Sequence, residues 1–206
     1  MKIFFMLAFI ISTATIIKAQ DFKTDLANAR TNYASGKLSD AHYNIEQAMQ
    51  ELDLIVGKEV LKILPAKIDT LNVNTGDDQV MSNSGFLGAN IHRSYGQLSN
   101  MMNNAGGKSA DISIVTNSPL ISGINTFLNT PILGGMMTSD ASKSIKVQGY
   151  KARLEKSNGS MGQIDYSIEV PLSNTLITFK VTNTTDTEIL NLVNTIPLQQ
   201  IAKLLQ

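Results

Sequence analysis

Residues 144–182 decide the fold through three segments: SIKVQGYKARLEK (144–156), IDYSIEV (164–170) and LITFKVT (176–182). Apolar and polar side chains alternate in each segment, which is the pattern of a β-strand with one buried and one solvated face. The intervals between the segments are too short for a crossover connection, so neighbouring segments must pair antiparallel. The stretch predicts a three-stranded antiparallel meander with turns at Asn158-Gly159 and Ser173-Asn174.

The first segment changes phase part of the way along. Ile145 and Val147 alternate in one phase, whereas Ala152 and Leu154 alternate in the other. Gly149 lies between the two pairs, and a glycine inside a strand pattern indicates a bulge or a close backbone approach. We therefore expect one strand, with a bulge or a close backbone approach at Gly149.

The composition limits the possible functions. The chain has 206 residues, 43% of them apolar and 17% charged, with a formal net charge of zero. Such a chain has no basic excess to attract nucleic acid or an anionic membrane surface. It also has no cysteine, which excludes disulfides, thiolate catalysis and cysteine-ligated metals. We expect a globular protein with no nucleic-acid partner.

Residues 1–19 are typical of a secretory signal peptide. Lys2 precedes an apolar run at 3–11, and Ala19 is a small residue suited to cleavage before Gln20. The run is shorter than the roughly 20 apolar residues of a membrane span, so we expect no stable span after cleavage. Removal of Lys2 and Lys18 would leave 15 basic against 17 acidic residues, a net charge of −2. The expected location is periplasmic or secreted, and the sequence does not distinguish the two.

Residues 20–64 predict a helical hairpin. The first helix carries apolar residues at helical spacing and stops at Ser35-Gly36, and the second begins with Ser39 as N-cap and ends before Pro65. The pair resembles one tetratricopeptide hairpin at these small and apolar positions: Ala29, Gly36, Leu38, Ala41 and Ala48. Such repeats need about three copies to bury a core, and only one copy is present. We expect a hairpin that packs on a sheet or serves as a partner surface.

Residues 65–206 predict an α+β domain. Apolar alternation indicates strands near Ile91 and Ile112, and Ser118-Pro119 is a typical helix start. The helix stripe is expected to bury these residues: Leu120, Ile121, Ile124, Phe127 and Leu128. Thr185 and Glu188 form a capping-box pattern for a final helix. The expected fold is α+β: the N-terminal hairpin, then an antiparallel sheet with the meander, covered by two helices.

Two segments of residues 85–206 stand in a distinctive order. The segment NSPLI (117–121) begins a helix directly after a strand, and IKVQGYKA (145–152) leads into the meander and a terminal helix. In these two features the chain resembles the α/β/α sandwiches of PsbP-like and DcrB-like exported proteins. The resemblance implies an extracytoplasmic accessory or binding role. It brings no shared set of catalytic residues.

Motifs for cofactors and metals are incomplete. Gly106-Gly107-Lys108-Ser109 ends like a phosphate-binding loop, but Met102 replaces the first glycine of that motif. The polar segment 72–78 lacks the alternating acids and closing Glu of an EF-hand, so a turn is the better interpretation. Two methionine pairs could hold copper(I) or fill packing gaps: Met101-Met102 and Met136-Met137. We expect no cofactor.

Four residues are candidates for a ligand or partner surface. Tyr33 and His42 belong to the predicted hairpin, and Lys151 and Arg153 share the polar face of the first meander segment. The two cations could bind an acidic ligand, or they could line a solvated strand face whose lysines discourage edge pairing. His42 and His92 are too few for a zinc site of the usual composition.

Three functions remain open. The first is a non-enzymatic envelope protein, a protein-interaction or accessory module that binds an envelope partner through the hairpin or an exposed helix face. The second is a small-molecule or lipid binder with an apolar cleft between sheet and helix. The third is a hydrolase with dispersed residues, which would require a cluster of perturbed titratable groups around His42 or His92. The oligomeric state is left open.

Overall fold

The computed structural model describes residues 17–82, 88–96, 107–129, 141–159 and 162–205. The chain divides into two compact units, Met1–Leu52 and Asp53–Gln206. The boundary between the units falls inside the helix α2 (Leu38–Ile63).

The first unit contains the predicted helical hairpin, formed by α1 (Ile17–Ala34) and the first part of α2. Gly36 ends α1 with a φ of 74°. Its amide donates to the Tyr33 carbonyl at 3.1 Å, and the Lys37 amide donates to the Asn32 carbonyl at 2.9 Å. This pair of hydrogen bonds is a Schellman motif, in which the left-handed residue is usually glycine.

The start of α2 differs from the prediction by two residues. The Lys37 carbonyl already accepts a hydrogen bond from the Ala41 amide at 3.0 Å, so Lys37 occupies the N-cap position. Ser39 lies in the first helical turn and is not the cap. The Schellman turn sets this start, because it leaves Lys37 as the last residue before the helix.

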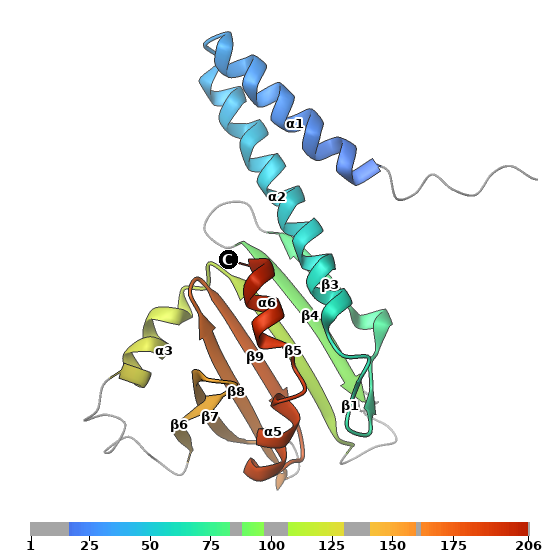
Figure 1. Cartoon of the computed structure of the whole chain (residues 1–206), viewed down its shortest axis with the longest axis vertical. Helices are drawn as coiled ribbons and strands as arrows, with labels where there is room; N and C mark the ends of the chain where they lie inside the picture. The colour runs from blue at the N-terminus through green and yellow to red at the C-terminus, as the bar shows by residue number, and fades with distance from the viewer. Residues whose placement is uncertain (1–16, 83–87, 97–106, 130–140, 160–161, 206) are drawn as a thin grey trace, which may run out of the picture. The chain divides into compact units, whose positions relative to one another are not determined.

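The second unit is built on one antiparallel sheet, which has seven strands in the described ranges (Figure 1). Their order is β3-β4-β5-β9-β8-β7-β6, and every neighbouring pair is antiparallel. The strands have these bounds: β3 (Gln79–Ser82), β4 (Ala89–Gly96), β5 (Ser109–Thr116), β6 (Ser142–Val147), β7 (Tyr150–Asn158), β8 (Ile164–Leu172) and β9 (Thr175–Val181). A short hairpin of β1 (Lys67–Ile68) and β2 (Leu71–Asn72) and the 3-10 helix η1 (Thr75–Asp77) precede them. The α+β fold class is therefore confirmed.

The first meander segment is two strands and not one bulged strand. Gln148 and Gly149 both have positive φ, 49° and 89°, and Val147 pairs with Tyr150 across them. Two central residues with positive φ are the mark of a type I′ turn, whose twist matches that of the flanking strands. The phase change in the sequence is thus a reversal of the chain, and the meander has four strands, β6 to β9.

One face of the sheet is the apolar core. Ile112 on β5, Ile168 on β8 and Phe179 on β9 are each at most 1% exposed. This face is packed by the end of α2, by α5 (Asp186–Val193) and by α6 (Leu198–Leu205). Thr185 is the N-cap of α5, as predicted, because its hydroxyl accepts from the Glu188 amide at 3.2 Å.

The helix α3 (Leu120–Asn129) lies against the opposite, polar face. The guanidinium carbon of Arg153 lies 5.9 Å from the centre of the Phe127 ring. The side-chain oxygen of Asn129 accepts a hydrogen bond from Lys151 at 2.7 Å. The two helices predicted to cover the sheet therefore lie on opposite faces. The predicted stripe of α3 is also wrong in extent, because only Ile124 of its described residues is buried and Leu120 is 62% exposed. A helix over a polar face has little apolar surface to pack against.

Phe179 is expected to be one of the largest single contributors to the core. Phe179→Ala removes a ring that is 1% exposed and should lower the free energy of unfolding by about 3–5 kcal/mol. Urea denaturation monitored by circular dichroism measures the loss. The control is Thr178→Ala on the other face of the same strand, which should lose much less; equal losses would contradict the assigned faces.

The turn at Gly149 gives a second prediction, with a matched glycine as control. A Cβ added at Gly149 or at Gly123 meets no atom within 4 Å, but only Gly149 has positive φ. Gly149→Ala should therefore cost about 1–2 kcal/mol of conformational strain. Gly123→Ala, inside α3, should instead stabilise by roughly 0.5–1 kcal/mol. Urea unfolding of both variants tests this, and a shift of the same sign in both would exclude the type I′ turn.

Candidate interaction surface

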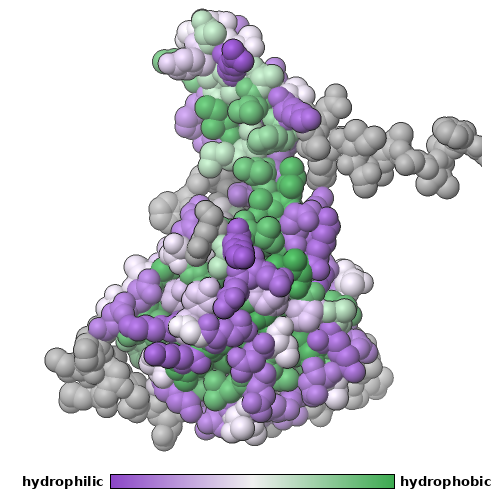
Figure 2. Space-filling model, viewed as in Figure 1, coloured by the Kyte–Doolittle hydropathy of each residue, from purple (hydrophilic) through white to green (hydrophobic). Residues whose placement is uncertain are grey.

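Exposed apolar side chains gather on the hairpin. The structure shows eleven large apolar side chains as exposed in the ranges it describes, and seven of them belong to α1 or α2. They are Leu26, Tyr33, Leu38, Tyr43, Ile45, Met49 and Leu52. Figure 2 shows apolar atoms on the visible face of this part of the chain. Monomeric proteins rarely leave such groups contiguous, so their arrangement on the helices matters.

The exposed residues of α2 follow a heptad. Leu38, Ile45 and Leu52 are seven residues apart, and Met49 is four after Ile45. This alternation of threes and fours places all four in one narrow stripe, the spacing of a coiled-coil seam. On α1, Leu26 and Tyr33 are also seven residues apart.

The two stripes lie on the same side of the hairpin. Ala29 on α1 and Ala41 and Ala48 on α2 are each 4% exposed, so we infer that the two helices face each other at these alanines. At about 100° per residue, Leu26 and Tyr33 lie roughly 40–60° around α1 from Ala29. The α2 stripe lies roughly 70° around α2 from its alanines, in the same direction of rotation along the helix. Because the two helices are antiparallel, equal rotations bring both stripes to the same side of the hairpin. We call the combined surface the hairpin face: Leu26, Tyr33, Leu38, Ile45, Met49 and Leu52.

Opposite charges border the hairpin face. Lys23 and Arg30 follow its edge on α1, and both are exposed. Glu46 follows its edge on α2, where its carboxylate lies 3.7 Å from Nδ1 of His42. Neither Lys23 nor Arg30 forms an ion pair with another residue in the part of the chain that the structure describes. The surface is therefore apolar in the middle apart from His42, basic along one edge and acidic along the other.

The four predicted surface residues separate into two pairs. Tyr33 is 71% exposed and is part of the hairpin face. The side chain of His42 is 74% exposed and lies within the stripe of α2. Lys151 and Arg153 belong to the second unit, on the polar face of β7 beneath α3.

The two cations of β7 are already engaged by the protein. Nε of Arg153 donates to Glu169 at 2.6 Å, and a second guanidinium nitrogen lies 3.4 Å from Glu155. Lys151 donates to Asn129. The two carboxylates neutralise the charge of Arg153, whereas the amide oxygen of Asn129 occupies a donor of Lys151 without neutralising it.

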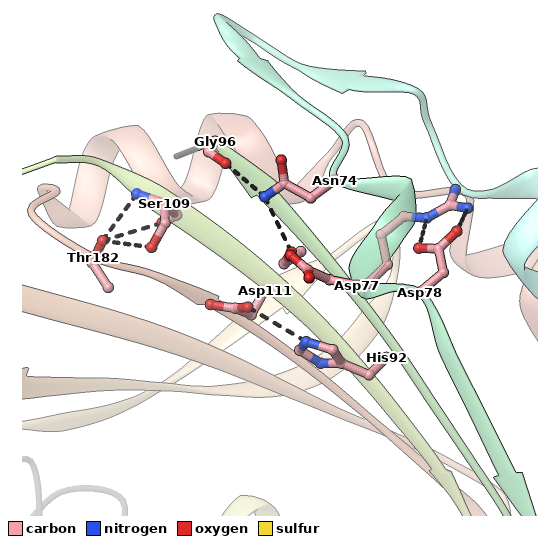
Figure 3. Close-up of polar contacts among 10 residues, drawn as sticks. Asn74, Asp77, Asp78, His92, Gly96, Ser109, Asp111 and Thr182 are labelled. Carbon is pink, nitrogen blue, oxygen red and sulfur yellow. Dashed lines mark hydrogen bonds and ion pairs between the residues drawn. The ribbon is translucent and has the colours of Figure 1, made fainter. Parts of the chain in front are cut away.

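A polar cluster on β4 and β5 was missed by the sequence interpretation (Figure 3). Nε2 of His92 lies 3.7 Å from the Asp111 carboxylate, and the Ser94 hydroxyl donates to Asp77 at 3.0 Å. The amide of Asn74 donates to Ser94 at 3.2 Å and to the Gly96 carbonyl at 2.6 Å. The sequence pattern that could have indicated this cluster is the alternation of His92 and Ser94 with Ile91 and Arg93. This alternation places His92 and Ser94 on the polar face of the sheet, opposite the core.

The cluster perturbs one carboxyl group. Burial raises the pKa of Asp111 above its ordinary value of 3.8, while the nearby His92 and Lys180 lower it and Asp77 raises it further. His92 has Ser113 as its cross-strand neighbour. Among the described residues, no hydrogen bond joins a hydroxyl to His92 or His42.

The segment 72–78 runs from the end of β2 through the 3-10 helix η1, and Asp77 and Asp78 accept hydrogen bonds from other residues of the chain. Both oxygens of Asp78 accept from Arg93, at 2.8 and 2.6 Å. In the described ranges no group of three or more metal-ligating side chains comes together. The two methionine pairs and Gly106 lie outside the described residues, and Lys108 pairs with Glu188.

The helices of the described ranges contain no stretch long and apolar enough to cross a membrane. No protein-family model matches the chain, and neither the curated proteins nor the solved structures contain a significant match. The resemblance to PsbP-like and DcrB-like proteins stays a prediction.

The raised pKa of Asp111 predicts how stability depends on pH. A carboxyl with a raised folded-state pKa favours folding below its unfolded value of 3.8, and this contribution is lost as the pH rises through the folded pKa. Asp111→Asn should therefore be more stable than the parent at pH 7. Urea unfolding across pH 3–7 should show the difference shrinking as the pH approaches 3.8.

Asp186 is the control, because its pKa is shifted in the opposite direction. The hydrogen bond from Lys143 is the main cause that lowers the pKa of Asp186. Its contribution to stability is present above 3.8 and is lost as the pH falls through the folded pKa. Asp186→Asn should thus be less stable than the parent at pH 7. If both variants changed the free energy of unfolding at pH 7 in the same direction, the opposite pKa shifts assigned to Asp111 and Asp186 would be wrong.

Proposed function

We propose that this protein is an exported, non-enzymatic interaction module that binds another protein through the hairpin face. The observation that carries the proposal is the exposure of the six side chains of this face, between 46% and 71%. Exposing such a surface costs free energy in water, and covering it with a partner recovers that cost. Export is inferred from the signal-like residues 1–19.

The form of the face favours a helical partner. A heptad stripe on α2 offers the holes and knobs that a facing helix fills at 3-4 spacing. The adjacent stripe on α1 widens the seam, so a partner helix would contact both α1 and α2. The charged borders provide selectivity, because a partner with the wrong sign along either edge is penalised.

Photo-crosslinking in the producing cells tests this proposal. A photoreactive phenylalanine analogue at Met49 should form one defined covalent adduct with a protein. The matched control places the analogue at Tyr43, which is 60% exposed but lies on the other side of α2. Tyr43 should give no such adduct.

A charged substitution within the hairpin face completes the test. Ile45→Glu should abolish the adduct at Met49, since a carboxylate in the seam cannot be desolvated without a partner charge. The free energy of unfolding should change by less than about 0.5 kcal/mol, because Ile45 is 47% exposed. Adducts of the same pattern at Met49 and Tyr43, or adducts that survive Ile45→Glu, would refute the proposal.

A further inference from the structure

We propose that the partner at the hairpin face is a second copy of this chain. The two hairpins form a four-helix bundle, in which α1 of each copy packs against α2 of the other around a two-fold axis parallel to the helices. This inference rests on the proposed function, because it names the occupant of the same surface. Three properties of the surface support it: the area, the opposite charges along the two edges, and the positions of those charges along the length of the helices.

The area suits a dimer of identical hairpins. A half-exposed side chain of this size leaves roughly 100 Å² in contact with water, so the six residues offer about 600 Å² per copy. A stable interface buries about 800 Å² per partner, and the charged borders supply further contact area. A two-fold axis also presents the same patch on both sides, so one self-complementary surface suffices.

The charges select the arrangement of the two copies. With the axis parallel to the helices, the basic edge of α1 meets the acidic edge of the partner's α2, and this happens twice. With the axis perpendicular to the helices, α1 would meet α1, and Lys23 and Arg30 would face the same cations of the second copy. Like charges placed opposite each other are disfavoured, so the first arrangement is the one that the sequence supports.

The charged residues also lie at matching levels. Counted from Gly36 at the turn, Arg30 is six residues away, Glu46 is ten and Lys23 is thirteen. At about 1.5 Å per residue, Glu46 lies roughly 6 Å from the level of Arg30 and roughly 5 Å from that of Lys23. An axis parallel to the helices preserves these levels in the second copy. Both long cationic side chains can therefore reach the same carboxylate.

The bundle also satisfies the packing preferences of helices. Each helix has two neighbours, its own hairpin partner and a helix of the second copy, and both run antiparallel to it. This is the usual neighbour relation in an up-and-down four-helix bundle. Within each hairpin, the small buried residues Ala29, Ala41 and Ala48 leave room for α1 and α2 to pack closely, and the larger side chains remain to fill the centre of the bundle.

Light scattering coupled to size-exclusion chromatography tests the dimer on the purified full-length protein, as the cell processes it. The parent should elute with the mass of a dimer at micromolar concentration. Ile45→Glu combined with Met49→Glu should raise the dimer dissociation constant by at least about 100-fold and elute as a monomer. Tyr43→Glu, on the other side of α2, should remain a dimer. Circular dichroism and the urea midpoint should show that all three proteins are folded.

A charge-swap series tests the orientation. Lys23→Glu with Arg30→Glu should weaken the dimer by roughly tenfold, because acidic residues then face Glu46 of the second copy. Adding Glu46→Lys to the same chain should restore the parent affinity, because each edge then carries the reversed but complementary sign. An arrangement with α1 against α1 would gain nothing from this third change, because the two acidic α1 edges would still face each other.

Each outcome separates this inference from the proposed function. A monomeric parent that still crosslinks from Met49 to a different protein would overturn the second copy and leave the proposed function intact. A dimer that survives the Ile45→Glu and Met49→Glu changes would overturn the assignment of the surface. A charge swap that fails to restore affinity would overturn the arrangement of α1 against the partner's α2.

Discussion

The antiparallel pairing of β5 with β9 is the constraint on which the second unit depends. β5 belongs to the first group of strands and β9 ends the meander, so this pairing joins two groups that are distant in the chain. It places Ile112 opposite Phe179 and Ile114 opposite Ile177, all of them at most 1% exposed. The apolar faces of the two groups thereby become one surface, wide enough for α2, α5 and α6 to pack on. Without it, the three strands β3 to β5 and the four strands β6 to β9 would form two separate sheets.

A buried charge ties the chain after α2 to this sheet. Arg93 lies on the apolar face of β4 at 8% exposure, where it binds both oxygens of Asp78 and donates to the Leu64 carbonyl at 3.2 Å. Tyr95 donates to the Pro65 carbonyl at 2.9 Å. A buried guanidinium is tolerated only when its donors are satisfied, so the positions of Asp78 and Leu64 are coupled to β4. The burial of side chains differs along α2. Val60 is fully buried in the second unit, whereas Ile45, in the first unit, is 47% exposed.

Much of the local structure could be predicted from single segments, because its causes are local. The Thr185 cap, the helix start after Ser118-Pro119 and the strand alternation around Phe179 depend on residues only a few positions apart. The Gln148-Gly149 turn was missed because glutamine rarely adopts a positive φ, so the pair lacks the usual Asn-Gly signal. The stripe of α3 was overestimated because helical spacing does not say how apolar the opposing surface is. The hairpin itself was predicted, with Tyr33 and His42 as candidate surface residues, but the choice between packing on a sheet and serving as a partner surface stayed open, since a heptad stripe has the same spacing whether it is buried or open.

The amino-acid sequence by itself determined the helices, most of the strands and turns, and the polar or apolar character of the faces of the central strands. These follow from backbone preferences and side-chain periodicity, which act within a few residues. The tertiary structure alone decided the strand order, the partners of Arg93, and the separation of α3 from α5 and α6 onto opposite faces. It also decided that the α2 stripe from Leu38 to Leu52 stays open while Val60 is buried. The physical reason is that burial depends on which distant segments arrive at a surface, and no local pattern records that.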